Sequence, residues 1–485
     1  MISRRNLLVR GAAALAGSAA LLQRFTSRLG AADSSAVPAP LAAGTPPPAN
    51  NSARRPYTPV TTPNGSTLPF VLKDGVKEFH LTAEPVRREF SPGVFVNCWG
   101  YNGQTPGPTI EAVEGDRVRI LVTNKLPEAT SVHWHGMILP AGMDGVAGVT
   151  QKAIPPGETY AYEFPLVQHG TQMYHPHTDE MVQMAMGMQG FFVIHPKDGE
   201  PEPIDRDFCI FLAEWFVAPG TSTPNPNVMT DFNLFTFNSR IFPGTDPLII
   251  KKNDRVRIRL ANLSMDNHPI HFHGHVWETT YADGGLIPKS ARYPSATVDV
   301  PPGTTRTTEF VANNPGDWPF HCHKTHHAMN AMTHDIPNVI GADQTKFQQT
   351  MNRLVPGSMS MGKTGMHDMT DMNMGLPRNT APMMAGQGPF GPVGMGGMFT
   401  LLKVRENLPN GYDADPGWYE HPPGTVAGPV GADGRPVAHP PTDENGAGKT
   451  MGGMKMTYTC VMHPEIKQDH PGNCPKCGMK LMSAK

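Results

Sequence analysis

The chain has little charge for its length. Asp, Glu, Lys and Arg make up 17% of its 485 residues, and the formal net charge is −2. A nucleic-acid-binding protein usually carries a basic patch and a high isoelectric point, whereas the isoelectric point here is about 6.9. We therefore expect no nucleic-acid partner.

The chain also lacks an apolar run long enough to cross a membrane. The apolar stretch at residues 11–22 is twelve residues long, and a membrane-spanning helix needs about 20. The stretch follows Arg4 and Arg5. A basic start before a short apolar run is typical of an export signal, and paired arginines indicate the twin-arginine route. We predict a signal peptide at residues 1–32, a periplasmic or otherwise exported location, and no membrane span.

Cysteine is scarce, with six in the whole chain. Cys322 stands between two histidines, and three others lie close together near the C-terminus, so the pattern is not that of a disulfide scaffold. Cys98 and Cys209 remain. A disulfide between them and two buried free thiols both fit the sequence, because free cysteine is often buried.

What the chain does contain is a duplicated pattern. Asp-Arg-Val-Arg-Ile at 116–120 recurs at 254–258, and seventeen positions after each Asp comes His-x-His-Gly, at 133–136 and at 271–274. An internal repeat of this kind indicates two related structural units.

The second half of the repeat carries the same signal. Pro-Pro-Gly at 155–157 recurs at 301–303, and twenty positions after each first Pro comes another His-x-His, at 175–177 and at 321–323. Each copy therefore has two His-x-His pairs. Eight imidazoles at matched places predict a metal cluster that two related domains share.

Alternating apolar and polar residues follow the turns in both copies, as expected of strands. The predicted strands cover 118–122, 160–164, 256–260 and 305–311. Abundant Gly (50) and Pro (51) also favour short strands and turns. We predict an all-β fold with one sandwich or barrel per copy. The predicted segments are a Pro-rich linker at 33–66 and domains at 67–200 and 201–345.

A His-x-His on a strand directs both imidazoles to one face, because alternate residues point the same way. In residues 321–323 this rule sends Cys322 to the opposite face, where it can bind a separate metal. Two histidines, a thiolate and a weak axial methionine form a blue-copper electron-transfer site. The expected partners are His268 and His327, with Met332 as the axial ligand and Met329 as its competitor.

These motifs resemble those of the multicopper oxidases, the laccase family: His-x-His-Gly, His-x-His, His-x-x-His-x-His at 268–273, and His-Cys-His-x-x-x-His with a downstream Met at 321–332. The resemblance implies cupredoxin-like Greek-key domains and four coppers per active unit. It assigns the type 1 copper to His268, Cys322, His327 and Met332, the type 2 copper to His133 and His271, and the type 3 pair to His135, His175, His177, His273, His321 and His323.

Two departures from the family pattern matter. Only about 90 residues separate His177 from His268, so the chain resembles the two-domain, small-laccase type, which implies a homotrimer with the cluster between subunits. The family also places an acid near the thiolate motif to supply protons, whereas this chain has Lys324, Thr325 and His326 there. Asp144 matches the other proton-relay acid, and His326 is a candidate substitute for the missing one.

Residues 346–400 are rich in methionine among small and polar residues. Thioether sulfur selects Cu(I), so the segment is a candidate Cu(I) binder; a plain low-complexity linker is the alternative. A second set of methionines, Met173 to Met188, fits core packing better. Residues 401–454 are predicted to be a linker.

Residues 455–485 resemble the small heavy-metal-binding domain that is attached to copper and silver exporters. About 30 residues cannot bury a core alone, so we expect bound Cu(I) or Ag(I), with a structural zinc knuckle as the alternative. The candidate ligands are Cys460, Met462, His463, Cys474, Cys477 and Met479.

Together the features predict a multicopper oxidase that reduces O2 to water. The electron donor is either Cu(I) or a phenol. The methionine-rich segment and the C-terminal segment favour Cu(I), which is consistent with a role in copper tolerance. A copper nitrite reductase is one alternative, but that enzyme has its blue-copper cysteine in the first domain, where this chain has Pro176. A non-enzymatic copper-binding protein is the other.

Overall fold

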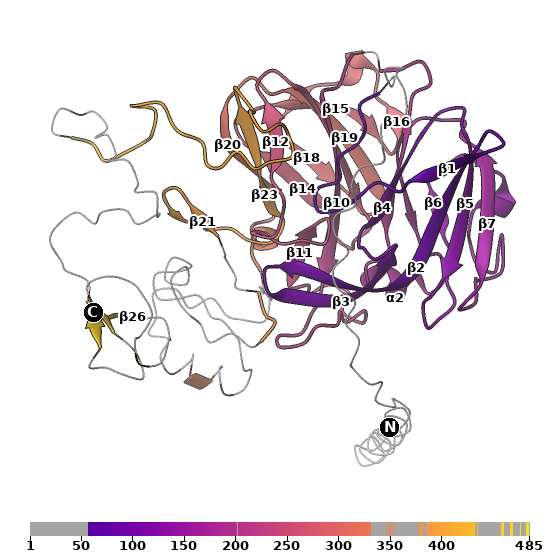
Figure 1. Ribbon diagram of the computed structural model, residues 1–485, viewed down its shortest axis with the longest axis horizontal. Coiled ribbons are helices and arrows are strands. Elements are labelled where there is room, and N and C mark those ends of the chain that lie inside the picture. Colours follow the sequence, from indigo (N-terminus) through magenta and orange to yellow (C-terminus); the bar gives the residue numbers. More distant parts are fainter. Residues whose placement is uncertain are drawn as a thin grey trace, which may run out of the picture. The chain divides into compact units, whose positions relative to one another are not determined.

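The computed structural model describes most of residues 57–330 and 378–431, together with short pieces further on. Within the two long ranges, residues 201 and 382–385 are not described. The short pieces that the structure also describes are 346, 349–350, 353, 434, 457–459, 466–468, 476 and 482–484. The regular secondary structure of the described part consists almost wholly of strands (Figure 1). The all-β prediction is confirmed. Among the described helices, none is long and apolar enough to cross a membrane.

The first domain is a sandwich of two sheets. One has the order β1-β2-β5-β7 with β3 paired to β2, and the other has the order β4-β9-β8-β6. The strands are β1 (Phe70–Lys73), β2 (Val76–Ser91), β3 (Val94–Tyr101), β4 (Gly107–Val113), β5 (Arg117–Asn124), β6 (His133–His135), β7 (Thr159–Pro165), β8 (Gly170–His175) and β9 (Gly190–His195). Two short helices, η2 (Ala141–Met143) and α2 (Glu180–Ala185), lie in its connections. The core between the sheets includes Phe79, Ile120 and Trp134, all fully buried.

The second domain repeats the sandwich. Its sheets have the orders β11-β10-β13-β19-β15-β16, with β17 paired to β15, and β12-β23-β20-β14-β18. The elements are β10 (Arg206–Trp215), β11 (Leu234–Phe237), β12 (Leu248–Lys251), β13 (Arg255–Asn262), β14 (His268–Phe272), β15 (Trp277–Ala282), β16 (Gly285–Leu286), η3 (Lys289–Ala291), β17 (Pro294–Ser295), β18 (Thr297–Val300), β19 (Thr304–Val311), β20 (Gly316–Cys322), η4 (Thr325–Ala328) and β23 (Phe399–Arg405). The predicted strand regions 118–122, 160–164, 256–260 and 305–311 fall within β5, β7, β13 and β19.

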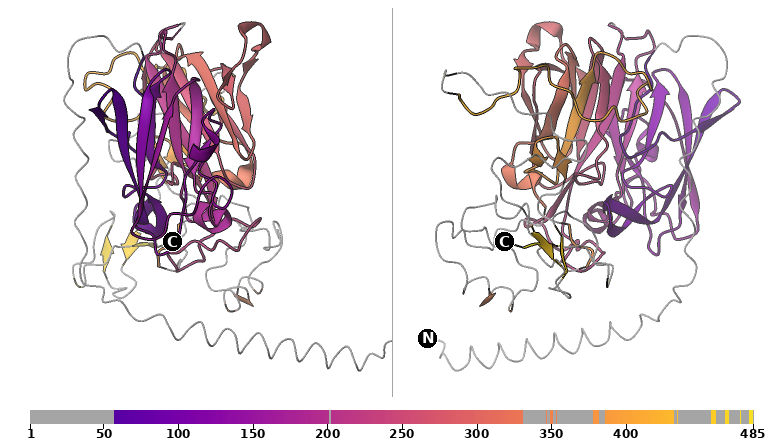
Figure 2. Two further views of the ribbon diagram at one scale, coloured as in Figure 1. Left: turned by 90° about the vertical axis from the view of Figure 1, so that its right-hand side faces the viewer. Right: turned by 60° about the vertical axis from the view of Figure 1, so that its left-hand side comes forward.

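The second domain extends beyond the expected boundary at 345. Strand β23 pairs with both β12 and β20, and Figures 1 and 2 show it in orange among the earlier strands of this domain. Residues after it also pack, since the Tyr412 hydroxyl donates to Asp254 at 3.0 Å and Arg405 donates to the Gly417 carbonyl at 2.6 Å. The linker expected at 401–454 is thus wrong for its first part, because the apolar run at 399–404 completes a sheet.

The linker expected at 33–66 is also too long. Thr61 donates its backbone N–H to Asp207 O at 2.7 Å, and Cys209 donates to Thr61 O at 3.0 Å. Val60 is buried. Residues 57–66 therefore form an arm that packs on the second domain and, through Val60 and Ser66, also on the first, and polar composition alone did not reveal this pairing.

The repeated Asp shapes the turn before the matched strands. The Asp116 carboxylate accepts the Val113 N–H at 2.8 Å, and the Asp254 carboxylate accepts the Lys251 N–H at 2.8 Å. The same residue type is needed because a short acceptor side chain can close this turn on itself.

The repeated Pro-Pro-Gly is explained in the same way. Gly157 and Gly303 have φ of +86° and +72°, a region that favours glycine. Their N–H groups donate to the carbonyls of Asn124 and Asn262 at 2.7 and 2.8 Å. The repeated motifs thus fix the ends of the strands that lead to the histidines.

The two domains meet through the His-bearing sheet of the first. Thr171 on β8 contacts the Thr307 hydroxyl on β19 at 3.1 Å and accepts from Arg259 at 2.8 Å. Cys98 and Cys209 are both buried free thiols, so the open question about a disulfide is answered in favour of thiols. Farther on, the described strands are β21 (Gln387–Gly388), β22 (Gly391–Pro392), β24 (Thr457–Thr459), β25 (Lys467–Gln468) and β26 (Met482–Ala484).

Candidate metal centres

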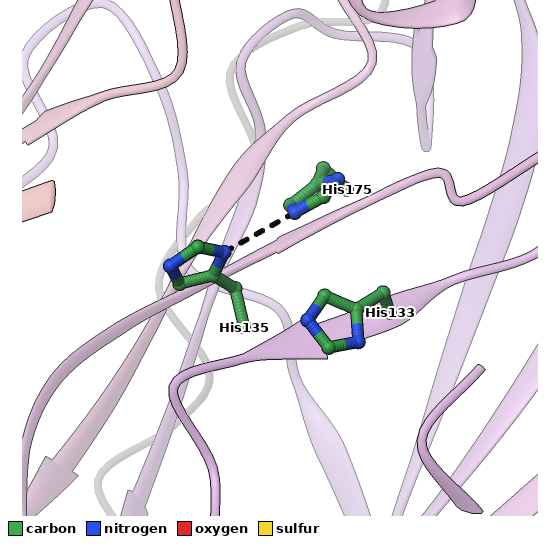
Figure 3. A group of neighbouring side chains, drawn as sticks. All are labelled: His133, His135 and His175. Atoms are coloured by element: carbon green, nitrogen blue, oxygen red, sulfur yellow. Dashed lines mark hydrogen bonds between the residues drawn. The ribbon is translucent and has the colours of Figure 1, made fainter. Parts of the chain in front are cut away.

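The first domain brings its four motif histidines to one face; we call His133, His135, His175 and His177 the domain-1 quartet. His133 on β6 lies opposite His175 on β8 in the antiparallel pair. Trp134, between His133 and His135, points into the core and is fully buried. Nδ1 of His135 lies 3.3 Å from Nε2 of His175 (Figure 3). Strand alternation therefore gathers imidazole nitrogens, as the His-x-His spacing requires.

The backbone holds these rings in orientations suited to a metal. His133 Nδ1 lies 2.8 Å from Asp144 O and 3.4 Å from its carboxylate. His175 Nδ1 lies 2.8 Å from Pro176 O. A ring whose Nδ1–H is engaged presents its bare Nε2 to a cation. Burial lowers the pKa of His175 to about 3, so this ring stays neutral, the form that binds metal.

A pocket of about 490 Å³ opens over the domain-1 quartet. Its walls include Glu180 and Met184 from the first domain and Ser264 and Gly303 from the second. None of the domain-2 motif histidines lies in this wall.

The second domain repeats the arrangement; His271, His273, His321 and His323 are the domain-2 quartet. His271 on β14 pairs with His321 on β20, and Nε2 of His273 lies 3.3 Å from Nε2 of His321. His271 Nδ1 lies 2.7 Å from Ala296 O, and His321 Nδ1 lies 2.9 Å from Cys322 O. A separate pocket of about 540 Å³, lined by domain-2 residues that include Trp318, opens there.

Cys322 faces the other way and forms the cysteine group with His268 and His327. The two Nδ1 atoms are 3.1 Å apart, and Cys322 Sγ lies 3.5 Å from Nδ1 of His327 and 3.8 Å from Nδ1 of His268. All three residues are fully buried. Phe235 stacks on His327 with 4.1 Å between ring centroids.

The electrostatics of the cysteine group fit a metal. Burial raises the pKa of the Cys322 thiol to about 12 and lowers that of His268 to about 3. Neutral imidazoles and a thiol that a cation must deprotonate are the donor set of a soft copper site. The axial ligand of the cysteine group is not defined, because Met332 lies outside the described residues. The competing candidate, Met329, is the residue that ends η4.

The ring of His326 lies beside the cysteine group. It contacts His327 and Phe235, with centroid distances of 4.4 and 5.8 Å. The proton role suggested for His326 stays a prediction. The Asp144 carboxylate lies 3.4 Å from Nδ1 of His133, and its proton role also stays a prediction.

Sequence reasoning missed three carboxylates beside these groups. Glu180 lies 3.6 Å from His175 Nδ1 and 4.0 Å from His177 Nε2. Glu214 lies 3.6 Å from His268 Nε2, and Asp266 lies 3.7 Å from His327 Nε2. Burial, reinforced by Asp266, raises the pKa of Glu214 to about 7. Glu180 follows His177 by three positions, a signal within reach, but nothing near Glu214 in the sequence points to His268.

The ligand residues expected in the C-terminal segment lie outside the described residues. They are Cys460, Met462, His463, Cys474, Cys477 and Met479. The described pieces there form a three-stranded sheet of order β25-β24-β26.

Comparisons with known proteins agree with this site. Sequence profiles described as multicopper oxidase match residues 82–199 and 219–340, and one described as heavy metal binding domain matches 457–484. The chain is 32% identical over 274 residues to a probable nitrite reductase-hydroxylamine oxidoreductase fusion protein of Kuenenia stuttgartiensis, covering 54% of this chain and 31% of that protein. It is 43% identical over 114 residues to copper resistance protein A of Escherichia coli, covering 24% of this chain and 18% of that protein.

Among solved structures, the fold is similar to the blue copper oxidase from Nitrosomonas europaea. The TM-score is 0.52 at 26% identity, covering 70% of this chain and 91% of that one. The multicopper oxidase mgLAC gives a TM-score of 0.50 at 27% identity with the same coverage. The chain spans less than a third of the length of the curated relatives named above. Since each half of the duplicated body matches a profile described as multicopper oxidase, the chain belongs to the multicopper oxidase family.

Proposed function

We propose that this protein is an exported oxidase that couples one-electron oxidation of a donor to the four-electron reduction of O2 to water. One observation carries the proposal: Cys322 lies in the cysteine group while its neighbours His321 and His323 belong to the domain-2 quartet. A single strand, β20, and the residue after it thus connect two metal environments across a few covalent bonds.

Copper, when bound at these groups, would supply the one-electron redox chemistry and the oxygen chemistry. The chain's own residues prepare that chemistry. Phe235 and the surrounding core exclude water from His327 and Cys322, and Asp144 orients His133. In the proposed assignment, His268, Cys322, His327 and Met332 hold type 1 copper, His133 and His271 hold type 2 copper, and the other six quartet histidines hold the type 3 pair.

We propose Cu(I) as the donor, ahead of phenols. The Nε2 atoms of His268 and His327 lie beside Glu214 and Asp266, and the half-exposed Asp266 carboxylate would attract a cation. Described residues are packed on both sides of residues 331–377, which hold most of the methionines of the predicted 346–400 segment. Asn330 on one side is buried next to η4, and the amide oxygen of Asn379 on the other side accepts from Phe95 N–H at 2.7 Å.

Asn379 also has contacts near β11. Asn379 also donates to Thr221 O at 2.7 Å, and the pocket that it lines includes Leu234. Leu234 precedes Phe235, the residue that stacks on His327. We propose that soft thioethers in the chain between these two packed ends bind Cu(I) and raise its local concentration.

We propose a homotrimer in which neighbouring subunits complete each oxygen-reducing centre. The two quartets lie in separate pockets of one chain, so neither pocket contains eight histidines. A heterologous contact that closes into a ring would bring the domain-2 quartet of one subunit to the domain-1 quartet of the next.

A twin-arginine signal, a periplasmic location and a role in copper tolerance complete the proposal; the relative named copper resistance protein A supports the last. The C-terminal segment would bind Cu(I) or Ag(I), or else zinc, through its cysteine, histidine and methionine residues.

Nitrite reduction is the second candidate, because the Kuenenia relative carries that name. Pro176 stands where the first domain would need a cysteine, so the cysteine group exists only in the second domain of the described chain. Oxygen uptake with Cu(I), a phenol and Mn(II) as donors, each repeated with nitrite under argon, tests the proposal. We expect four electrons per O2 with Cu(I) as the best donor; nitrite consumption without O2 uptake would overturn the oxidase function.

A further inference from the structure

The methionines that follow β8 do not all lie in the core. Met173 and Met188 are fully buried, in agreement with the core packing that the sequence favours. Met181 is 52% exposed, and Met184 is partly exposed in the wall of the pocket over the domain-1 quartet. For these two thioethers, both on α2, the expected core packing is wrong.

The rotation of α2 about its axis decides which side chains face outward. Gln183 is fully buried. Its side-chain amide donates to the Ala129 carbonyl at 2.8 Å, and its side-chain oxygen accepts from the Thr130 hydroxyl at 2.6 Å. Met181 lies two positions before Gln183, on the opposite side of the helix, and Met184 lies three positions after Met181, on the same side as Met181. Two buried hydrogen bonds therefore hold both thioethers outside the core.

The duplication shows that this place has a different role in each domain. His327 and Met181 each stand four positions after a His-x-His, and His268 and Thr130 each stand three positions before one. In the second domain His268 and His327 turn inward to the cysteine group. In the first domain the hydrogen bond between Thr130 and Gln183 closes the matching place, and Met181 faces solvent.

A carboxylate lies beside the two thioethers. Glu180 also belongs to α2 and to the pocket wall. Its side chain is 44% exposed, and its carboxylate oxygens lie 3.6 Å from Nδ1 of His175 and 4.0 Å from Nε2 of His177. The outer side of α2 therefore presents two thioether groups and a carboxylate next to the pocket.

The spacing of the two methionines allows both sulfurs to reach one ion. Cβ atoms three positions apart on a helix are about 5–6 Å apart, and a methionine side chain is unbranched, with three rotatable bonds. Two sulfurs on one ion lie at most about 4.6 Å apart when each metal–sulfur bond is about 2.3 Å. Rotation of the two side chains covers that difference without any movement of the helix.

We propose that Met181 and Met184 form a binding site for a soft monovalent cation, Cu(I) or Ag(I), beside the domain-1 pocket. Thioether sulfur selects such ions, and the Glu180 carboxylate compensates the positive charge. The site is distinct from the histidine quartets, the cysteine group and the methionine-rich segment. As an entry point for copper it rests on the proposed function. Binding itself requires no electron transfer and no O2, so the two can fail separately.

Protection from oxidation tests the site in the full, metal-free chain. Hydrogen peroxide converts accessible methionine to its sulfoxide, and peptide mass spectrometry follows each methionine separately. Ag(I) alone should slow the oxidation of Met181 and Met184 about tenfold once its free concentration reaches roughly ten times its Kd. Met265 is 58% exposed and serves as the internal control, with the same oxidation rate expected with and without Ag(I).

Zn(II) alone is the control for the metal. Its ligands in proteins are imidazole, thiolate and carboxylate, so it should leave the oxidation of both α2 thioethers unchanged. Protection by Zn(II), equal protection of Met265 by Ag(I), or no protection by Ag(I) would each overturn the proposal. In the first two cases the thioethers are shielded without a sulfur–metal bond of their own.

Met184→Leu and Met265→Leu are matched variants, because leucine keeps a similar apolar volume and removes the sulfur. Ag(I) should no longer protect Met181 in the Met184→Leu chain and should still protect it in the Met265→Leu chain. Met181→Leu, at an exposed position that the fold does not depend on, repeats the test with Met184 as the reporter. An unfolding midpoint equal to that of the parent confirms the fold of each variant. Protection that persists after loss of either sulfur contradicts a two-sulfur site.

Discussion

Replacing Cys322 with serine separates the ligand role of the sulfur from its packing role. The side chain is 0% exposed, and burial raises its pKa from 9.0 to about 12. Three pKa units at 1.36 kcal/mol each mean that forming the thiolate without a metal costs about 4 kcal/mol more in the folded protein than in water. A copper ion must offset that cost, and its bond to the thiolate gives rise to an intense blue charge-transfer band.

The Cys322→Ser protein should lose the blue band and one copper per chain, and keep the copper held by the quartets. Serine stays protonated, so it cannot replace the thiolate. The metal-free variant should lose about 1–3 kcal/mol of unfolding free energy, because the new hydroxyl is buried among apolar side chains. Visible absorption, copper analysis and urea unfolding measure the three quantities.

Cys209→Ser is the matched control. Cys209 is likewise a buried free thiol with 0% exposure, so its replacement should cost similar stability and leave the colour unchanged. A blue Cys322→Ser protein, or a colourless Cys209→Ser protein with normal copper content, would refute the assignment of the cysteine group.

Three further predictions concern the donor, the assembly and pH. Deleting residues 351–377, which spares the packed Asn379, should raise the KM for Cu(I) roughly tenfold through loss of effective concentration and leave oxidation of a bulky phenol unchanged; equal loss of both would show a structural role. Inactive His133→Ala and His321→Ala proteins, dissociated and reassembled together, should recover about a quarter of the parent activity, since one interface in four pairs two intact halves in a random ring; an active monomer by light scattering would contradict the ring. The pKa of Glu214 is about 7 in the folded protein and 4.5 in its ordinary, solvated state. As pH rises from 4.5 to 7, ionisation of Glu214 therefore lowers the free energy of unfolding by up to about 3 kcal/mol. Metal-free Glu214→Gln protein should therefore lose less stability than the parent between pH 4.5 and 7.5, measured by urea unfolding. If the free energy of unfolding depends on pH equally in the two proteins, Glu214 does not titrate in this range.

The duplication made most of the site predictable. Strand alternation placed Cys322 opposite its two histidine neighbours, because the side-chain period of a strand is fixed at two. The spacing from the repeated Asp to His-x-His carried over from one copy to the other, because both copies use the same turn. Local geometry sufficed wherever ligand and neighbour lie on one strand.

Prediction was poorer where the chain returns to a sheet after a long detour. Strand β23 joins the second domain from position 399 onward, and residues 57–66 join it from the other end. Both pairings depend on contacts more than 70 residues apart, which local composition does not encode.

Glu214 shows most clearly what decides the environment of the cysteine group. It lies near the end of β10, and β10 runs parallel to β13 with Leu212 opposite Asn262. Two residues farther along each strand, Glu214 reaches the loop that leads into β14 and accepts the N–H groups of Met265 and Asp266 at 3.2 Å. Those two bonds hold a carboxylate beside the His268 ring even though burial opposes its charge. The strand pairing that builds the second domain therefore also fixes the polarity on the Nε2 side of His268, one of the proposed type 1 ligands.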